Sequence, residues 1–345
     1  MSPSALTDRE KRILELVVEI YVRTATPVSS KYLAKRFGLG LSPATIRHVL
    51  GELEVKGYLS QPHISAGRIP SDKGYRFYVD HLMKVRTLAK KERAAIQAAV
   101  AMSSVDVRRI LEAASGVLGN ISSQLGVVME PLFFQGIFQK LELVSVSDSR
   151  LMVVISIKSG LVKTIMMEVE SGLSRHVLAE TSTILNERLS GLSVREVKET
   201  IDERLRDVRG GDEKLIRYIV KSSNRLFDFS KESDIMLSGA LNITSSPEFS
   251  DRNYAEKILS LISDKEGLWD CFADAFQEDF SIRIGTENPG VSFDGCSMIT
   301  ASYHVGDVAG RVGVVGPTRM SYKRIVPLVD YMGQLLTNEL NVRLS

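Results

Sequence analysis

The stretch from residue 42 to residue 76 constrains the fold of this chain most, because it predicts a helix followed by a short hairpin. Ser42 can cap a helix N-terminus, and Pro43 fits the first helical position, where its missing N–H costs nothing. Apolar residues then recur at spacings of three and four, which predicts a buried stripe of Ile46, Val49, Leu50 and Leu53. The outward positions carry short or polar side chains that suit a DNA groove. They are Ala44, Thr45, Arg47 and His48.

A wing follows this helix. The helix is expected to end near Gly57, and residues 58–61 read as a short strand. A small-residue turn at residues 65–67 then leads into a returning segment that begins with Arg68. The order helix, strand, turn, strand predicts a wing with an arginine on its returning strand.

Two earlier helices complete a helix-turn-helix unit. Thr7 and Glu10 form a capping box ahead of an amphipathic helix. After the breaker at residues 26–27, Ser29 or Ser30 can cap a second helix, which ends at the glycine-bearing turn of residues 38–40. In such a unit the helix after the turn enters the major groove, and its N-terminal residues reach base edges.

This geometry assigns expected roles to individual side chains. Arg47 is the natural base reader, with Ser42, Thr45 and His48 around it, while Lys31 and the wing residues hold phosphates or the minor groove. A lone histidine such as His48 is also compatible with an ordinary surface position. The DNA-binding candidates are Ser42, Ala44, Thr45, Arg47, His48, Lys31, His63, Ser65 and Arg68.

The charge distribution supports a nucleic-acid-binding head. Residues 1–90 hold 15 Lys and Arg against 8 Asp and Glu, a net charge of +7, while the other 255 residues hold 29 against 34, a net charge of −5. A basic head attracts phosphates without specifying a sequence. Charge alone would equally describe a solvated basic surface. The helix and wing pattern favours DNA.

The rest of the chain predicts an α+β body with an inserted unit. Three short antiparallel strands are expected at residues 138–146, 150–158 and 162–170, followed by helices at 174–190, 194–208 and 212–229. Around this unit we expect a helix at 94–126, strands near 235–243, 280–286, 296–304 and 308–315, and helices near 252–263, 266–277 and from residue 321. The predicted domains are a winged helix-turn-helix at 1–85, a linker and first body part at 86–134, the inserted domain at 135–230 and the second body part at 231–345.

No motif in the sequence indicates catalysis or a cofactor. The chain lacks a phosphate-binding glycine loop, a Gly-x-Ser-x-Gly nucleophile elbow and a His-Glu-x-x-His metal-binding helix, and its five histidines are scattered. Cys271 and Cys296 match no zinc spacing and are expected to be buried free thiols. We therefore expect no enzyme activity, no cofactor and no metal. The absence of a membrane-length apolar run and of a signal-peptide core favours a cytoplasmic protein.

Two features near the C-terminus allow alternative interpretations. Gly306, Gly310, Gly313 and Gly316 fit hairpin-turn and close-packing positions, although a ligand pocket in this region stays open. Arg319 follows a predicted strand and precedes a helix, where backbone N–H groups can receive an anion. The favoured reading is that Arg319 ties the C-terminal helix or the linker to the body through a carboxylate.

The amino-acid sequence of several blocks resembles that of the heat-inducible transcription repressor HrcA family of bacteria. The resemblance covers nearly the whole chain. Its blocks are residues 41–47, 57–59, 61–63, 65–70 and 74–80 in the head, and 185–192, 247–251, 284–288 and 316–322 downstream. This chain departs from the family pattern at His48, where asparagine is usual, and at Ile64, where threonine usually follows the wing histidine.

The resemblance implies a fold and a function. The fold would be α+β and multidomain, with a winged-helix head, a GAF-like α/β body and an inserted α+β dimerisation domain. A homodimer would bind an inverted repeat upstream of chaperonin genes, and the chaperonin GroEL would assist the folding of the repressor. Heat stress would occupy GroEL, leave the repressor inactive and turn the genes on. The alternative from another class is a winged-helix transcription factor that senses a small molecule bound in the GAF-like domain.

Overall fold

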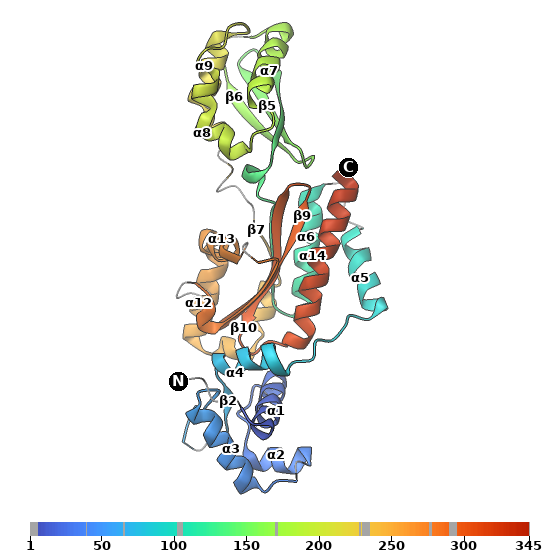
Figure 1. Ribbon diagram of the computed structural model, residues 1–345, viewed down its shortest axis with the longest axis vertical. Coiled ribbons are helices and arrows are strands. Elements are labelled where there is room, and N and C mark those ends of the chain that lie inside the picture. Colours follow the sequence, from blue (N-terminus) through green and yellow to red (C-terminus); the bar gives the residue numbers. More distant parts are fainter. Residues whose placement is uncertain are drawn as a thin grey trace.

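The computed structural model shows an elongated molecule with a winged-helix head at one end, a five-stranded body in the middle and a three-stranded unit at the other end (Figure 1). The residues described are 6–38, 40–64, 66–101, 106–169, 172–227, 229, 235–275, 278–289 and 295–344.

The head contains the elements that the caps predict. Its elements are α1 (Asp8–Thr24), α2 (Ser30–Phe37), α3 (Pro43–Val55), β1 (Leu59–Ser60), β2 (Ile69–Pro70) and α4 (Asp72–Phe77). Thr7 and Glu10 form the predicted capping box of α1, Ser29 caps α2 in preference to Ser30, and Ser42 caps α3. The helix-turn-helix prediction is confirmed.

The wing is a minimal antiparallel ribbon. β1 pairs with β2 through Leu59 opposite Pro70, and a separate bridge joins Arg68 to Val28 before α2. Gly67 precedes this bridge, and a Cβ placed on it would lie 2.5 Å from the carbonyl oxygen of Val28. The position therefore requires glycine, because a side chain would displace the backbone of the neighbouring segment.

The GAF-like body is built on an antiparallel sheet with the strand order β7-β3-β10-β9-β8. These strands are β3 (Leu125–Met129), β7 (Ile235–Ser238), β8 (Phe280–Ile284), β9 (Cys296–Val305) and β10 (Val308–Pro317). One face carries α6 (Val107–Ser122) and α14 (Tyr322–Leu344), with α5 (Lys90–Ala101) outside α6, and Figure 1 shows α12 (Arg252–Ser263) and α13 (Lys265–Asp274) on the other side.

The structure corrects two predictions in the body. The single helix expected at residues 94–126 is wrong: α5 and α6 are separate helices, Asp106 caps α6, and the central strand β3 begins at Leu125. All five residues of β3 are buried, so the strand shows no alternation that would distinguish it from the end of an apolar helix. The strand expected at 235–243 ends at Ser238, and α11 (Ala240–Thr244) follows it.

The three-stranded unit lies between two neighbouring strands of the body sheet. The chain leaves that sheet after β3 and returns at β7, which pairs with β3 through Gly126 opposite Ser238. The unit comprises β4 (Phe138–Ser147), β5 (Arg150–Ile157), β6 (Val162–Glu168), α7 (Arg175–Leu189), α8 (Val194–Leu205), α9 (Glu213–Lys221) and α10 (Ser223–Leu226). The predicted antiparallel meander is confirmed. Its helices are also close to their predicted ranges, apart from a break at Ser222.

The close-packing reading of the C-terminal glycines is confirmed at the sheet. Gly306 has a φ of +57° in the turn between β9 and β10. A Cβ on Gly313 would lie 2.3 Å from the carbonyl oxygen of Ile299 on the neighbouring strand. Cys271 and Cys296 are buried free thiols, as expected, and burial raises the pKa of Cys271 to about 11.

Candidate nucleic-acid interface

The third helix of the head presents a polar face outward from a buried apolar stripe. The Ser42 Oγ accepts the Thr45 N–H at 3.1 Å and lies 2.9 Å from the Thr45 Oγ1, so both side chains hold the helix N-terminus. The four stripe residues are at most 4% exposed. They are Ile46, Val49, Leu50 and Leu53. This packing fixes the rotation of α3 and leaves the opposite face in solvent.

Three of the predicted groove residues lie on that open face. Ala44, Arg47 and His48 are exposed, and Thr45 is half-buried beside the cap. Among the described residues none forms a hydrogen bond or ion pair with Arg47, which leaves its guanidinium available to a ligand. The Nε2 of His48 lies 3.5 Å from the Oε1 of Glu52, one turn further along α3.

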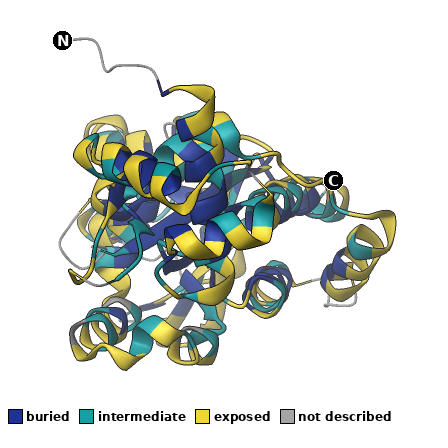
Figure 2. Ribbon diagram, turned by 90° about the horizontal axis from the view of Figure 1, so that it is seen from below, coloured by how far each residue is buried: buried dark blue, intermediate teal, exposed yellow. Residues whose placement is uncertain are grey.

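The face lies at the end of the molecule, away from the body. Figure 1 places α3 and α2 at the far side of the head, with α1 and α4 towards the five-stranded sheet. Figure 2 views the molecule from this end and shows exposed residues on the outer surfaces of the nearest helices, with buried residues behind them. A duplex can therefore reach α3 without meeting the body.

The second helix adds positive charge to this end of the head. Lys31 is exposed in the first turn of α2, as the phosphate role requires. Lys35 and Arg36 are also exposed, in the last turn of the same helix. The sequence reasoning omitted these two residues, although the basic balance of the head and their position before the turn into α3 were available signals.

The wing turn is organised by a residue that the sequence reasoning omitted. Gln61 donates from its Nε2 to the carbonyl oxygens of Ile64 at 2.8 Å and Ala66 at 3.0 Å. His63 is exposed at this turn, and Ile64 is fully exposed. Ser65, another predicted contact, lies outside the described residues. The wing therefore presents an imidazole and an apolar side chain to solvent.

Arg68 makes a contact within the head that the sequence did not predict. Its Nη2 lies 2.7 Å from the Oε2 of Glu54 on α3, and the side chain is only 18% exposed. This ion pair engages the Nη2 group of Arg68 and fastens the wing to α3. A contact between Arg68 and DNA stays a prediction.

A second ion pair joins the end of α3 to α1. The Lys56 Nζ, just after α3, lies 2.5 Å from the Oε1 of Glu10 in α1, and Glu10 is 3% exposed. Burial raises the pKa of Glu10, but hydrogen bonds from Lys56 and Thr7 outweigh it, and the pKa is lowered overall. The capping box of α1 and the end of α3 therefore share one carboxylate.

Arg319 and the titratable side chains outside the head were the other candidates for a site. Arg319 pairs with Glu248, as the carboxylate reading predicted. In the residues described, no group of three His, Cys, Asp or Glu side chains could hold a metal ion. No described helix combines the length and the apolar character needed to cross a bilayer.

The fold and the open face of α3 together define a winged-helix DNA-binding protein. The profile of the LexA DNA binding domain matches residues 3–65, and that of the HrcA protein C terminal domain matches residues 108–326. The chain belongs to the HrcA family of heat-inducible transcription repressors.

Individual relatives support this assignment over nearly the full length. The heat-inducible transcription repressor HrcA of Chlorobium phaeobacteroides (strain BS1) is 40% identical, with 97% of this chain and 99% of that protein covered. The repressor of the same name from Prosthecochloris aestuarii is 41% identical, with 96% and 97% covered. The family resemblance is confirmed, and the small-molecule sensor is not favoured.

A solved structure shares the fold. It is described as the crystal structure of a hypothetical protein at 2.2 Å resolution, and it is 22% identical to this chain with a TM-score of 0.61. The match covers 98% of this chain and 100% of the other.

Proposed function

We propose that this protein represses transcription of heat-shock genes by binding, as a homodimer, an inverted-repeat operator upstream of chaperonin genes. The observation that carries the proposal is the exposed polar face of α3, whose opposite face is packed in the core of the head. The chain is also 40% identical to a heat-inducible transcription repressor over nearly its whole length. Repression at an operator requires no catalytic step. Its site of action would be the DNA in the cytoplasm.

In this proposal α3 reads bases and its neighbours bind the backbone. Arg47 is the base reader, because an arginine in the major groove can donate two hydrogen bonds to a guanine edge. Ser42, Ala44, Thr45 and His48 shape the groove contact around it. Lys31 and His63 bind phosphates or the minor groove, and we add Lys35 and Arg36 of α2 to the phosphate contacts.

The three-stranded unit is proposed to form the dimer. Its sheet packs one face on helices, where Asn186 of α7 accepts from the Leu141 N–H at 2.7 Å and donates to the Leu141 carbonyl at 3.0 Å. The other face carries exposed apolar side chains from β4 and β6 beside the half-buried Met152 of β5, and Val144, Met152 and Met166 are cross-strand neighbours. The exposed members include Val144 at 38%, Val162 at 54% and Met166 at 42%.

A second copy of the chain is the occupant that the proposed function requires. A two-fold operator is read by a two-fold protein, and a contiguous apolar patch on a soluble protein marks an interaction surface. In each chain this face lies at the end away from the head, so joining two copies through it would leave both heads uncovered (Figure 1).

Regulation is proposed from the family resemblance. The chaperonin GroEL would assist the folding of the repressor to its DNA-binding state. Unfolded protein produced by heat would compete for GroEL, and the fraction of active repressor would fall.

The test is a footprint of the purified protein on the chaperonin promoter, with and without GroEL and ATP after partial denaturation. We expect two symmetric protected half-sites, and a larger protected fraction when GroEL is present. Equal affinity for an unrelated promoter would contradict operator binding. A footprint that GroEL leaves unchanged would contradict the chaperonin part alone.

A further inference from the structure

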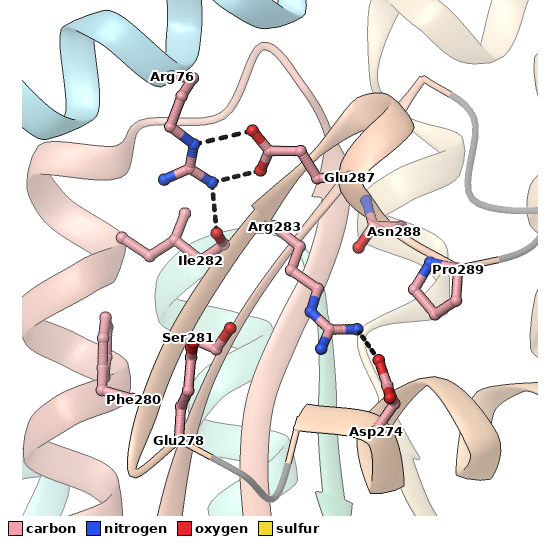
Figure 3. A pocket seen from close by; sticks show the side chains of 10 residues that line it. All are labelled: Arg76, Asp274, Glu278, Phe280, Ser281, Ile282, Arg283, Glu287, Asn288 and Pro289. Carbon is pink, nitrogen blue, oxygen red and sulfur yellow. Dashed lines mark hydrogen bonds and ion pairs between the residues drawn. The ribbon is translucent and has the colours of Figure 1, made fainter.

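The head is attached to the body by an arginine clasp on α4. Arg76 faces Glu287 with the Nε–Nη2 edge of its guanidinium, which donates to both carboxylate oxygens, and its Nε lies 2.8 Å from the Glu287 Oε1 (Figure 3). The same guanidinium donates to the Ile282 carbonyl oxygen of β8 and lies 3.2 Å from the Asp80 Oδ1. Nearby, Asp72 accepts the N–H of Thr286 at 3.0 Å. Two-pronged pairs of this kind fix direction as well as distance.

A second clasp joins the body to α1. Arg319, in the loop between β10 and α14, pairs with Glu248 and donates to the Val22 carbonyl oxygen at 2.6 Å. Val22 lies in the last turn of α1, where carbonyl groups lack partners within the helix, and a cation there is favoured by the helix dipole. Lys323 of α14 forms an ion pair with Glu19 of α1.

Buried aromatic rings lie between the two clasps. Tyr75 of α4 and Tyr322 of α14 are each 1% exposed, and their ring centroids are 5.9 Å apart. With α1 and α4 both held, the head is constrained about more than one axis. Residues 83–89, all described, form neither helix nor strand, so this linker alone would not set the orientation of the head.

The clasps account for sequence blocks that the DNA contacts leave unexplained. Four blocks of the family resemblance meet at this junction: residues 74–80, 247–251, 284–288 and 316–322. They lie on the side of the head opposite to α3 (Figure 1). The junction therefore holds the head without covering its reading face.

We propose that Arg76 and Arg319 are positioning residues for operator recognition. They hold the head in one orientation on the body, and in the dimer they thereby set the distance and angle between the two α3 helices. The inference rests on the proposed function. A head released from its clasps would still read one half-site, but it would lose the advantage of two heads already placed for both half-sites.

The experiment measures the dependence of binding on half-site spacing. The probes are the inverted-repeat duplex from the chaperonin promoter, duplexes with base pairs inserted between the half-sites, and a duplex with a single half-site. Each inserted pair rotates one half-site by about one tenth of a turn relative to the other. The proteins are the wild type, Arg76→Ala, Arg319→Ala and the double variant. Arg252→Ala is the matched control, because it removes an equal charge from an exposed pair with Glu256 on α12.

We expect wild type and Arg252→Ala to bind the native spacing about tenfold or more tightly than the altered spacings. The double variant should bind all spacings within about threefold of one another and keep wild-type affinity for the single half-site. An unchanged spacing profile would overturn the inference. Tighter binding at every spacing would also overturn it, because the clasps would then hold the head away from its binding orientation.

A milder variant covers the case in which the double variant does not fold. Arg76→Lys keeps the charge but loses the two-pronged geometry, and its spacing profile should lie between those of wild type and Arg76→Ala. If Arg76→Lys keeps the wild-type spacing profile and neither Arg76→Ala nor Arg319→Ala flattens it, the positioning role is refuted. If wild type itself fails to prefer the inverted repeat, the proposed function fails, which is a separate result.

Discussion

Single residues decide whether the reading face of the head is rigid. Glu10 accepts from the capped end of α1 and from Lys56 beyond α3, and Arg68 joins the wing to α3 through Glu54. The sequence predicted the caps correctly, because a cap depends on residues three positions apart. It did not predict the ion pair between Arg68 and Glu54, because the pattern of one strand does not reveal a carboxylate on a neighbouring helix.

Gly67 is predicted to be intolerant of any side chain. The Gly67→Ala variant should lower the free energy of unfolding by about 1–3 kcal/mol, because its Cβ would meet the backbone of Val28. Gly51→Ala is the control, since a Cβ there meets nothing within 4 Å and helix propensity should stabilise the head slightly. Denaturant unfolding of the two variants provides the measurement. Equal stability of the two would contradict the close approach at the wing.

Glu10 is predicted to make the head sensitive to acid. Because its pKa in the folded protein is lowered, its stabilisation is fully present above the ordinary value of 4.5 and is lost as the pH falls through the folded pKa. Glu10→Gln should lower stability at neutral pH and flatten its pH dependence below 4.5. Thermal unfolding at a series of pH values tests this against Asp8→Asn, which alters an exposed acid in the same turn. The idea is refuted if both variants keep the wild-type slope.

At the scale of elements, predictions succeeded where periodicity was clear. The apolar stripe of α3 shows its buried face in the sequence. The strand β3 is buried on both faces and shows no such pattern. The junction between the head and the body is not visible in the sequence either, because its partners are far apart in the chain: Arg76 and Glu287 are separated by 211 positions. Such contacts depend on packing that local pattern does not contain.

The outer face of the three-stranded sheet is predicted to hold the dimer together. Met166→Asp should weaken dimerisation about tenfold or more, because a charge at a central apolar contact cannot be buried without a partner. Leu259→Asp is the control, since Leu259 is 53% exposed on α12, outside this sheet. Sedimentation velocity over a range of concentrations measures both. A Met166→Asp protein that stays dimeric at all concentrations would exclude this face as the interface.

At the scale of the whole molecule, the proposed function places DNA reading and dimer assembly at opposite ends of the chain. The open face of α3 lies at one end, the apolar sheet face lies in the unit at the other end, and the clasped body connects them (Figure 1). On this proposal, operator binding would depend on base contacts in α3, on the orientation of the head at the junction and on association through the sheet, and each can be varied by its own substitutions.

The most direct test of the account compares Arg47→Ala with Lys31→Ala on the chaperonin-promoter inverted repeat and on a scrambled duplex of the same composition. Arg47→Ala should cost about 1–3 kcal/mol on the operator and much less on the scrambled duplex, because Arg47 reads a base edge. Lys31→Ala should weaken both duplexes alike and reduce the salt dependence, because Lys31 binds phosphate. Equal loss on both duplexes for Arg47→Ala would contradict sequence reading by α3.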